Sequence, residues 1–154
     1  GFFNGVCGYA IALSLIDTSE TERGMTFAFF VGLALFIFGA WLNKNSDAIL
    51  RRLRESSPEK YAIPEGGAFR FVSCPNYLGE LIQWFGYAIA SGTLASAAYF
   101  IYSASNLIPR AASNHKWYRK EFPDYPDVRT PLVPSVKSLI TVSLLNYRAN
   151  THRD

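Results

Sequence analysis

The sequence predicts an all-α fold, a polytopic bundle of membrane-spanning helices. Residues 1–16, 25–43 and 81–109 contain no charged side chain, although charged residues make up 18% of the 154-residue chain. A helix that crosses a bilayer core of roughly 30 Å needs about 20 apolar residues. Two of these stretches reach that length, and the first comes close to it. The mean hydropathy of +0.07 conceals the pattern, because the charges are concentrated between the uncharged stretches.

The longest uncharged stretch is too long for one span, and Ser91-Gly92-Thr93 near its middle is typical of a tight turn. We therefore divide it into two spans. In chain order, the expected membrane spans are residues 2–16, 25–42, 77–91 and 94–108. Residues 61–75 connect the second span to the third and contain turn-forming prolines and glycines.

Basic residues predict which side of the membrane the connections face. Residues 44–60 contain five basic and three acidic side chains, and residues 110–129 contain the same numbers. Lys and Arg next to membrane spans favour the cytoplasmic side, and four spans place both segments on one side. We expect residues 44–75 and 110–134 to be cytoplasmic, at the endoplasmic reticulum of a eukaryote or the inner membrane of a bacterium.

Composition and motifs exclude several classes of function. The content of 49% hydrophobic and 16% aromatic residues excludes a disordered chain. Cys7 and Cys74 are too few for a disulfide scaffold and have no histidine at a zinc-binding spacing, so we expect no metal site. A net charge of +3 is too small to indicate nucleic-acid binding. Gly66-Gly67 belongs to neither a P-loop nor a dinucleotide-binding glycine motif.

The first candidate site is a polar stripe that follows the second span. Positions i, i+4, i+8 and i+11 of one helix face hold Asn43, Asp47, Arg51 and Arg54. Arginine binds phosphate through a planar fork of donors, so this stripe suits an anionic ligand. The same spacing also fits a solvated helix in which Asp47 pairs with Arg51 and the arginines face lipid headgroups.

The second candidate site lies at the start of the third span, where Asn76, Glu80 and Gln83 share a helix face. A carboxylate that enters a membrane helix costs roughly 2.5–3.5 kcal/mol, so such residues usually face a cavity or a partner. This favours a functional Glu80. The structural alternative is a glutamate that reaches the interface or pairs with an arginine.

The third candidate site follows the fourth span. Arg110, Asn114 and Tyr118 have the spacing i, i+4, i+8, and His115, which can titrate near neutral pH, lies beside them. An aromatic and basic helix at the membrane interface would show the same pattern, so this segment alone favours neither interpretation.

Together these segments resemble the membrane steroid 5α-reductase family, the 3-oxo-5α-steroid 4-dehydrogenases, and are closest to its plant-type members. The resemblance covers nearly all of residues 1–134. The matching stretches are NKNSDAILRRLR (43–54), YAIPEGGAFRFVSCPNYLGE (61–80), NLIPR (106–110), HKWY (115–118) and FPDYP (122–126). The second of them is long and specific.

The resemblance implies a fold of seven membrane helices, of which this chain would hold the last four. Residues 1–134 would be the C-terminal membrane domain of a longer protein, and residues 135–154 a tail of unassigned role. The implied activity is NADPH-dependent reduction of the 4,5 double bond of a 3-oxo-Δ4 steroid, with hydride added at C5 and a proton at C4. The tyrosine and glutamate that polarise the steroid ketone belong to the family's N-terminal helices, so this chain would supply mainly the NADPH half of the site and be inactive alone.

The resemblance also implies roles for single residues. Glu80 would lie between cofactor and steroid, and Tyr118 would support catalysis as well as contact the cofactor. The implied NADPH-binding residues are Asn43, Asp47, Arg51, Arg54, Asn76, Arg110, Asn114, Tyr118 and Arg129. The expected partners are a steroid or another lipid-like enone and membrane lipids, with no nucleic acid and no metal.

Three alternatives remain open. The related trans-2-enoyl-CoA reductases share the wording of Val72–Tyr77 and also reduce an unsaturated carbonyl compound with NADPH. An isoprenylcysteine methyltransferase-like or sterol reductase-like enzyme is more distant. A membrane scaffold whose arginines meet anionic lipid headgroups, or a non-catalytic membrane fragment, would not be an enzyme.

Overall fold

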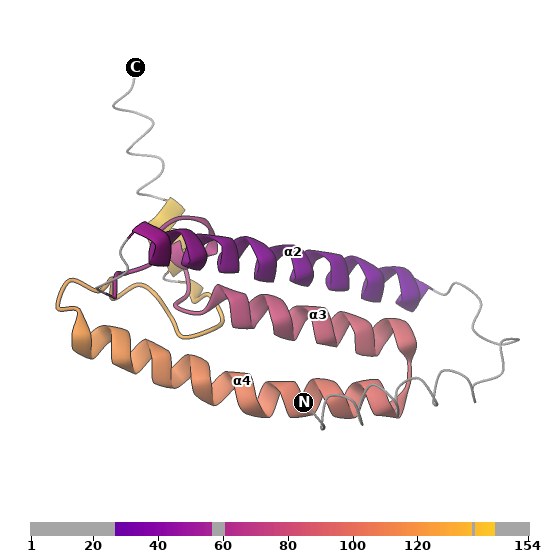
Figure 1. Cartoon of the computed structure of the whole chain (residues 1–154). Coiled ribbons are helices and arrows are strands. Elements are labelled where there is room, and N and C mark those ends of the chain that lie inside the picture. The colour runs from indigo at the N-terminus through magenta and orange to yellow at the C-terminus, as the bar shows by residue number, and fades with distance from the viewer. Residues whose placement is uncertain (1–26, 57–60, 137, 144–154) are drawn as a thin grey trace, which may run out of the picture. The chain divides into compact units, whose positions relative to one another are not determined.

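The computed structural model describes residues 27–56, 61–136 and 138–143, and its elements are helices (Figure 1). Their order is α2 (Phe27–Ser56), the short 3-10 helix η1 (Gly67–Arg70), α3 (Pro75–Ser91) and α4 (Leu94–Glu121). Within the described residues, strand-like pairing is limited to an isolated bridge between Val72 and Thr130. The prediction of an all-α fold is confirmed. The predicted span 2–16 and residues 144–154 of the predicted tail lie outside the described residues.

α2 joins the predicted second span and the first polar stripe in one continuous helix. Phe27–Glu55 is long and apolar enough to cross a membrane, and α2 is the one helix in the described part of the chain that meets this measure. Its apolar half exposes large side chains, among them Phe27, Ile37 and Trp41, as in a helix that faces lipid. This fits a membrane helix bundle, while the crossing of a membrane by α3 and α4 stays a prediction.

The predicted tight turn separates α3 from α4. Gly92 has a φ of 60°, a left-handed backbone conformation that glycine adopts without steric cost. Thr93 caps the next helix, because its Oγ1 accepts a hydrogen bond from the backbone N–H of Ser96 at 3.2 Å. The Ser91 hydroxyl donates to Ser96 Oγ at 2.6 Å, so the buried hydroxyl groups of this turn satisfy one another.

α4 is longer than the predicted fourth span. It passes Pro109 without ending and continues to Glu121. The predicted membrane segment therefore occupies only the first part of a 28-residue helix. This continuity places Arg110, Asn114 and Tyr118 on successive turns of one helix, as their spacing predicts.

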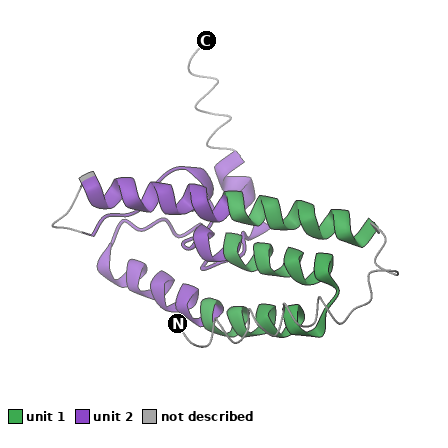
Figure 2. Cartoon of the chain, turned by 45° about the vertical axis from the view of Figure 1, so that its right-hand side comes forward, with its two compact units in different colours: residues 1–41, 79–107 green, residues 42–78, 108–154 purple. Residues whose placement is uncertain are grey.

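The chain divides into two compact units, each described here by itself (Figure 2). Unit 1 comprises residues 1–41 and 79–107, and unit 2 comprises residues 42–78 and 108–154. Each of the three long helices contributes to both units, because the boundaries fall inside the helices.

In unit 1, glycines bring the backbones of α2 and α3 into direct contact. A Cβ atom built on Gly39 would lie 2.6 Å from the carbonyl oxygen of Gly79. A Cβ on Gly86 would lie 2.6 Å from the carbonyl oxygen of Gly32. Small residues at helix interfaces allow this close approach, which favours packing between apolar helices in a membrane.

The core of unit 2 lies between the loop that precedes α3, the second half of α4 and the segment that follows α4. Phe69, Val72 and Ala111 are fully buried there. The two non-helical segments are joined by backbone hydrogen bonds, in which the Ser73 N–H donates to the Thr130 carbonyl at 2.8 Å and the Thr130 N–H donates to the Phe71 carbonyl at 3.2 Å. These bonds fix the loop before α3 against the segment after α4.

Candidate functional site

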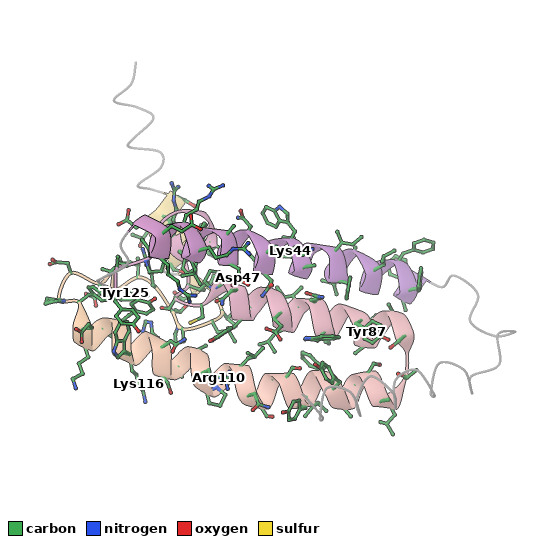
Figure 3. All side chains as sticks on the ribbon, viewed as in Figure 1. Lys44, Asp47, Tyr87, Arg110, Lys116 and Tyr125 are labelled. Atoms are coloured by element: carbon green, nitrogen blue, oxygen red, sulfur yellow. The ribbon has the colours of Figure 1, made fainter. Side chains whose placement is uncertain are left out.

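The predicted cofactor residues all belong to unit 2, whereas Glu80 belongs to unit 1. α2 carries Asp47, and the second half of α4 carries Arg110 (Figure 3). Glu80 is half-buried on α3, one helical turn after Asn76. The candidate site is therefore described through unit 2, and its relation to Glu80 stays a prediction.

The first and second polar stripes meet at Asn43. Its side-chain amide on α2 donates a hydrogen bond of 3.0 Å to the main-chain carbonyl of Asn76 at the start of α3. This bond uses the main-chain carbonyl of Asn76 and does not involve its side-chain amide. Further along α2, Asp47 is half-buried, while Arg51 and Arg54 are exposed. The stripe thus ends in guanidinium groups that solvent or an anion can reach.

On α4, Asn114 and Tyr118 approach the buried thiol of Cys74. The Asn114 amide donates to Cys74 Sγ at 3.8 Å. Burial raises the pKa of the Cys74 thiol to about 11, and the hydrogen bond from Asn114 opposes part of the rise. Burial, followed by the proximity of Cys74 and Tyr125, raises the pKa of the Tyr118 phenol, and Arg129 and Arg54 oppose the rise. Tyr118 is therefore a protonated hydrogen-bond donor at neutral pH.

Arg129 is the buried cation of unit 2, with 7% of its surface exposed. One guanidinium nitrogen donates to the Pro64 carbonyl at 3.0 Å, and Cζ lies 5.3 Å from the centre of the Tyr125 ring. No carboxylate among the described residues forms an ion pair with it. Buried charges usually have a charged partner, and a guanidinium has five N–H donors. Its partners among the described residues are thus a neutral carbonyl and a ring, and a buried guanidinium with such partners fits the binding of an anion.

Two residues of this region, Ser73 and Tyr125, escaped the sequence analysis. The Tyr125 hydroxyl donates to Ser73 Oγ at 2.7 Å, and Ser73 Oγ lies 2.7 Å from Nδ1 of His115. These partners are separated by 52 and 42 positions in the chain, so no helical or local spacing connects them. Ser73, His115 and Tyr125 all lie in the stretches that match the family, and this resemblance was the signal in the sequence that could have indicated them.

The donor set determines the chemistry that unit 2 supports. It offers amides, a protonated phenol and guanidinium groups, which bind phosphate, ribose and amide groups well. The thiol of Cys74 is buried and its pKa is high, so it is a poor nucleophile at neutral pH. Among the described residues, no three His, Cys, Asp or Glu side chains gather where they could hold a metal ion. The arrangement therefore favours binding and orienting an anionic cofactor.

The high pKa of Cys74 leads to a test in a Cys7→Ser background. Because its pKa of about 11 exceeds the ordinary value of 9.0, the thiolate fraction at pH 8 is about 100-fold lower than for an ordinary cysteine. We expect N-ethylmaleimide to modify Cys74 at least that much more slowly than the same cysteine in protein unfolded by detergent. Mass spectrometry over time measures both rates, and equal rates would contradict the buried, protonated thiol.

Comparisons with known proteins identify relatives of this chain. A family model described as 3-oxo-5-alpha-steroid 4-dehydrogenase matches residues 2–137. The steroid 5-alpha-reductase DET2 of Arabidopsis thaliana is 41% identical over 121 residues, which are 78% of this chain and 46% of the plant protein. The 3-oxo-5-alpha-steroid 4-dehydrogenase 1 of Rattus norvegicus is 44% identical over 108 residues, 70% of this chain and 42% of the rat protein.

A third relative covers more of the chain. The 3-oxo-5-alpha-steroid 4-dehydrogenase 2 of Macaca fascicularis is 44% identical over 131 residues, which are 84% of this chain and 52% of that protein. The chain thus spans about half the length of the curated relatives that it matches.

Proposed function

The chain belongs to the 3-oxo-5-alpha-steroid 4-dehydrogenase family, and we propose that its protein reduces the 4,5 double bond of a 3-oxo-Δ4 steroid with NADPH. The names of the relatives support the substrate class. The observation that carries the cofactor proposal is the buried Arg129 guanidinium, which lacks a carboxylate partner among the described residues. We further propose that this chain contributes mainly the cofactor half of the site.

The side chains of unit 2 have distinct proposed roles in this reaction. Arg129, together with the exposed Arg51 and Arg54, would bind the phosphates, because guanidinium forks match phosphate oxygens. The remaining proposed cofactor contacts come from Asn43, Asp47, Asn76, Arg110, Asn114 and Tyr118. Tyr118 would donate its phenolic proton in a hydrogen bond, since the raised pKa keeps the phenol neutral. Glu80 and Tyr118 would also support the reaction next to the steroid.

The chemistry itself divides between the cofactor and the protein. The hydride comes from NADPH and is added at C5, while a proton is added at C4. Negative charge then develops on the ketone oxygen, and donors placed in advance lower the barrier. The residues of this chain would orient the cofactor and exclude water from a site between helices.

A membrane location accompanies this proposal. α2 can cross a membrane by its length and composition, and we propose that α3 and the first part of α4 cross it as well. Residues 44–75 and 110–134 would then lie on the cytoplasmic side, where NADPH is available. The membrane would be the endoplasmic reticulum in a eukaryote or the inner membrane in a bacterium. Exposed apolar side chains on α2 and α4, such as Phe30 and Ile101, support contact with lipid.

The deciding experiment uses membranes that contain the protein from its complete reading frame, with any residues that precede Gly1. NADPH deuterated at the nicotinamide C4 is supplied with either a 3-oxo-Δ4 steroid or a trans-2-enoyl-CoA. We expect the steroid product to gain one deuterium at C5 and one solvent hydrogen at C4, as mass spectrometry and NMR would show. Reduction of the thioester alone would assign the protein to the enoyl-CoA reductases. Reduction of neither substrate would contradict the proposal.

A single variant then connects this activity to unit 2. We expect Asn76→Ala to lower kcat/KM about tenfold or more, because an amide that would contact the cofactor is lost from the proposed site. Asn106→Ala is the matched control, since Asn106 is exposed on α4 and its amide donates to the Tyr102 carbonyl one turn earlier. Equal activity of the two variants would remove Asn76 from the proposed site.

A further inference from the structure

One hydroxyl group connects three separate segments of unit 2. Ser73 lies in the loop before α3 and is 3% exposed. Its Oγ accepts a hydrogen bond from the Tyr125 hydroxyl, which belongs to the segment after α4, and lies 2.7 Å from Nδ1 of His115 on α4. The rings of His115 and Tyr125 also meet edge to face, with their centres 5.9 Å apart. These three residues are called the Ser73 network below.

The single proton of the Ser73 hydroxyl determines which atom donates in each hydrogen bond of the network. Because Ser73 Oγ accepts from Tyr125, its own proton is available to donate to Nδ1 of His115. That requires a neutral imidazole whose proton is on Nε2. Burial, and to a lesser extent the positive charge of Arg119, lower the pKa of His115 and favour this neutral form. This neutral form allows both hydrogen bonds of Ser73 Oγ, the one from Tyr125 and the one to His115, to exist together at neutral pH.

Each member of the network is close in the chain to a residue of the proposed cofactor site. Asn76 follows Ser73 by three positions, and Asn114 immediately precedes His115. Arg129 follows Tyr125 by four positions. The network thus lies close in the chain to the proposed cofactor-binding side chains at the start of α3, on α4 and in the segment after α4.

Tyr125 contacts two of the proposed cofactor residues directly. Its ring is stacked on that of Tyr118, with the centres 5.4 Å apart and the planes inclined by 13°. The guanidinium of Arg129 lies over the same ring. Tyr125 is 6% exposed, so a shift of its ring would move both neighbours. The orientation of the Tyr125 ring is in turn fixed at its hydroxyl by Ser73.

We propose that Ser73, His115 and Tyr125 are positioning residues, which hold the three segments together so that Asn76, Asn114, Tyr118 and Arg129 face one cofactor. The role toward the cofactor rests on the proposed function above. The hydrogen-bonded connection itself does not, and it can be measured without any cofactor.

The variants remove single hydrogen-bonding groups and leave the packing nearly intact. Tyr125→Phe removes only the hydroxyl that donates to Ser73, and Ser73→Ala removes the central oxygen. His115→Asn keeps an acceptor close to the position of Nδ1, whereas His115→Leu removes it. Tyr61→Phe is the matched control, because Tyr61 belongs to the same unit, is 80% exposed and contacts the Trp117 ring with its own ring.

The first measurement is the rate at which N-ethylmaleimide modifies Cys74 without cofactor, in a Cys7→Ser background. Cys74 follows Ser73 directly and is 4% exposed, so opening of the network makes its thiol accessible. We expect Tyr125→Phe, Ser73→Ala and His115→Leu to raise this rate about tenfold, the effect of one lost hydrogen bond. His115→Asn and Tyr61→Phe should stay within about twofold of the parent protein.

The second measurement separates positioning from general loss of structure. In membranes with the complete protein, we expect Tyr125→Phe to raise the KM for NADPH about tenfold. The KM for the steroid and kcat at saturating NADPH should stay within about twofold of the parent values. A merely structural role would instead reduce the amount of active enzyme, which lowers kcat and leaves both KM values unchanged.

Three results would overturn the proposal. Unchanged Cys74 modification in both Tyr125→Phe and Ser73→Ala would show that the network does not hold the segments. Equal defects in His115→Asn and His115→Leu would reject the role of the Nδ1 acceptor. Faster modification of Cys74 with no change in the KM for NADPH would reject positioning of the cofactor. If the parent protein does not use NADPH, the proposed function fails, whereas Cys74 modification still decides whether the network exists.

Discussion

Replacing Gly39 by leucine should push α2 away from α3 and destabilise the packing of unit 1. Even a bare Cβ at this position would lie 2.6 Å from the Gly79 carbonyl oxygen, and it would also meet the backbone nitrogen of Gln83. These neighbours are backbone atoms of a helix, so they cannot move aside as a flexible side chain would. Inserting atoms into a packed core typically costs about 1–3 kcal/mol, and we expect the upper end of that range here.

Thermal unfolding of the purified protein in detergent, followed by tryptophan fluorescence, measures this effect. A loss of about 3 kcal/mol corresponds to a fall in Tm on the order of 10 °C for a domain of this size. Ala34→Leu is the matched control, because Ala34 lies on the exposed side of the same helix and a larger apolar side chain there would face lipid. Equal Tm values for Gly39→Leu and the parent protein would show that α2 and α3 do not pack at Gly39.

This glycine contact illustrates what the sequence could not predict about the fold. The uncharged stretches predicted where helices occur, because a membrane span excludes charge over a fixed length. Gly92 predicted the turn, because a local backbone conformation favours glycine there. Gly39 and Gly79 look the same as Gly92 in the sequence, and their role appears only when the facing helix is known. Local signals therefore predicted the elements, while the contacts between elements required the structure.

The candidate site follows the same division. Helical spacing predicted that Arg110, Asn114 and Tyr118 share a face of one helix, and α4 confirms the helix. Arg129 lies in no periodic pattern, and only the resemblance indicated it. Its bond to Pro64 spans 65 positions in the chain, and such long-range partners leave no local pattern. Much of unit 2 consists of segments that are not helical, so helical periodicity in the sequence could predict only its helical part.

Replacing Arg129 by methionine should abolish tight NADPH binding while the fold persists. Methionine has nearly the length of the arginine stem and can fill the same buried space. Replacing a buried ion pair by apolar residues of similar volume is often neutral for stability, and Arg129 has no carboxylate partner among the described residues that its loss would leave unpaired. The folding cost should therefore be limited to the contact with the Tyr125 ring and the hydrogen bond to Pro64, the latter about 1.5–3 kcal/mol for a charged donor.

The substitution should lower the affinity for NADPH more than it lowers the stability of the fold. Truncating one partner of a buried, hydrogen-bonded charge pair costs about 2–5 kcal/mol, which corresponds to a loss of affinity of roughly 30-fold to several thousand-fold. Arg129→Lys should recover only part of this loss, because an ammonium group keeps the charge without the planar fork of donors. If the guanidinium had a purely structural role, both variants would instead be unstable and neither would differ from the parent protein in affinity for NADPH.

Thermal unfolding with and without NADPH measures the stability of the fold and the binding of the cofactor in one experiment. A ligand at 100 times its Kd stabilises the folded state by about 2.7 kcal/mol, so NADPH should raise the Tm of the parent protein by several degrees. Without NADPH, Arg129→Met should unfold several degrees below the parent protein, and the same NADPH concentration should raise its Tm much less than it raises that of the parent. If NADPH raised the Tm of Arg129→Met as much as that of the parent, the buried guanidinium of unit 2 would not bind the cofactor. Its burial would then be explained by its contacts with Pro64 and the Tyr125 ring.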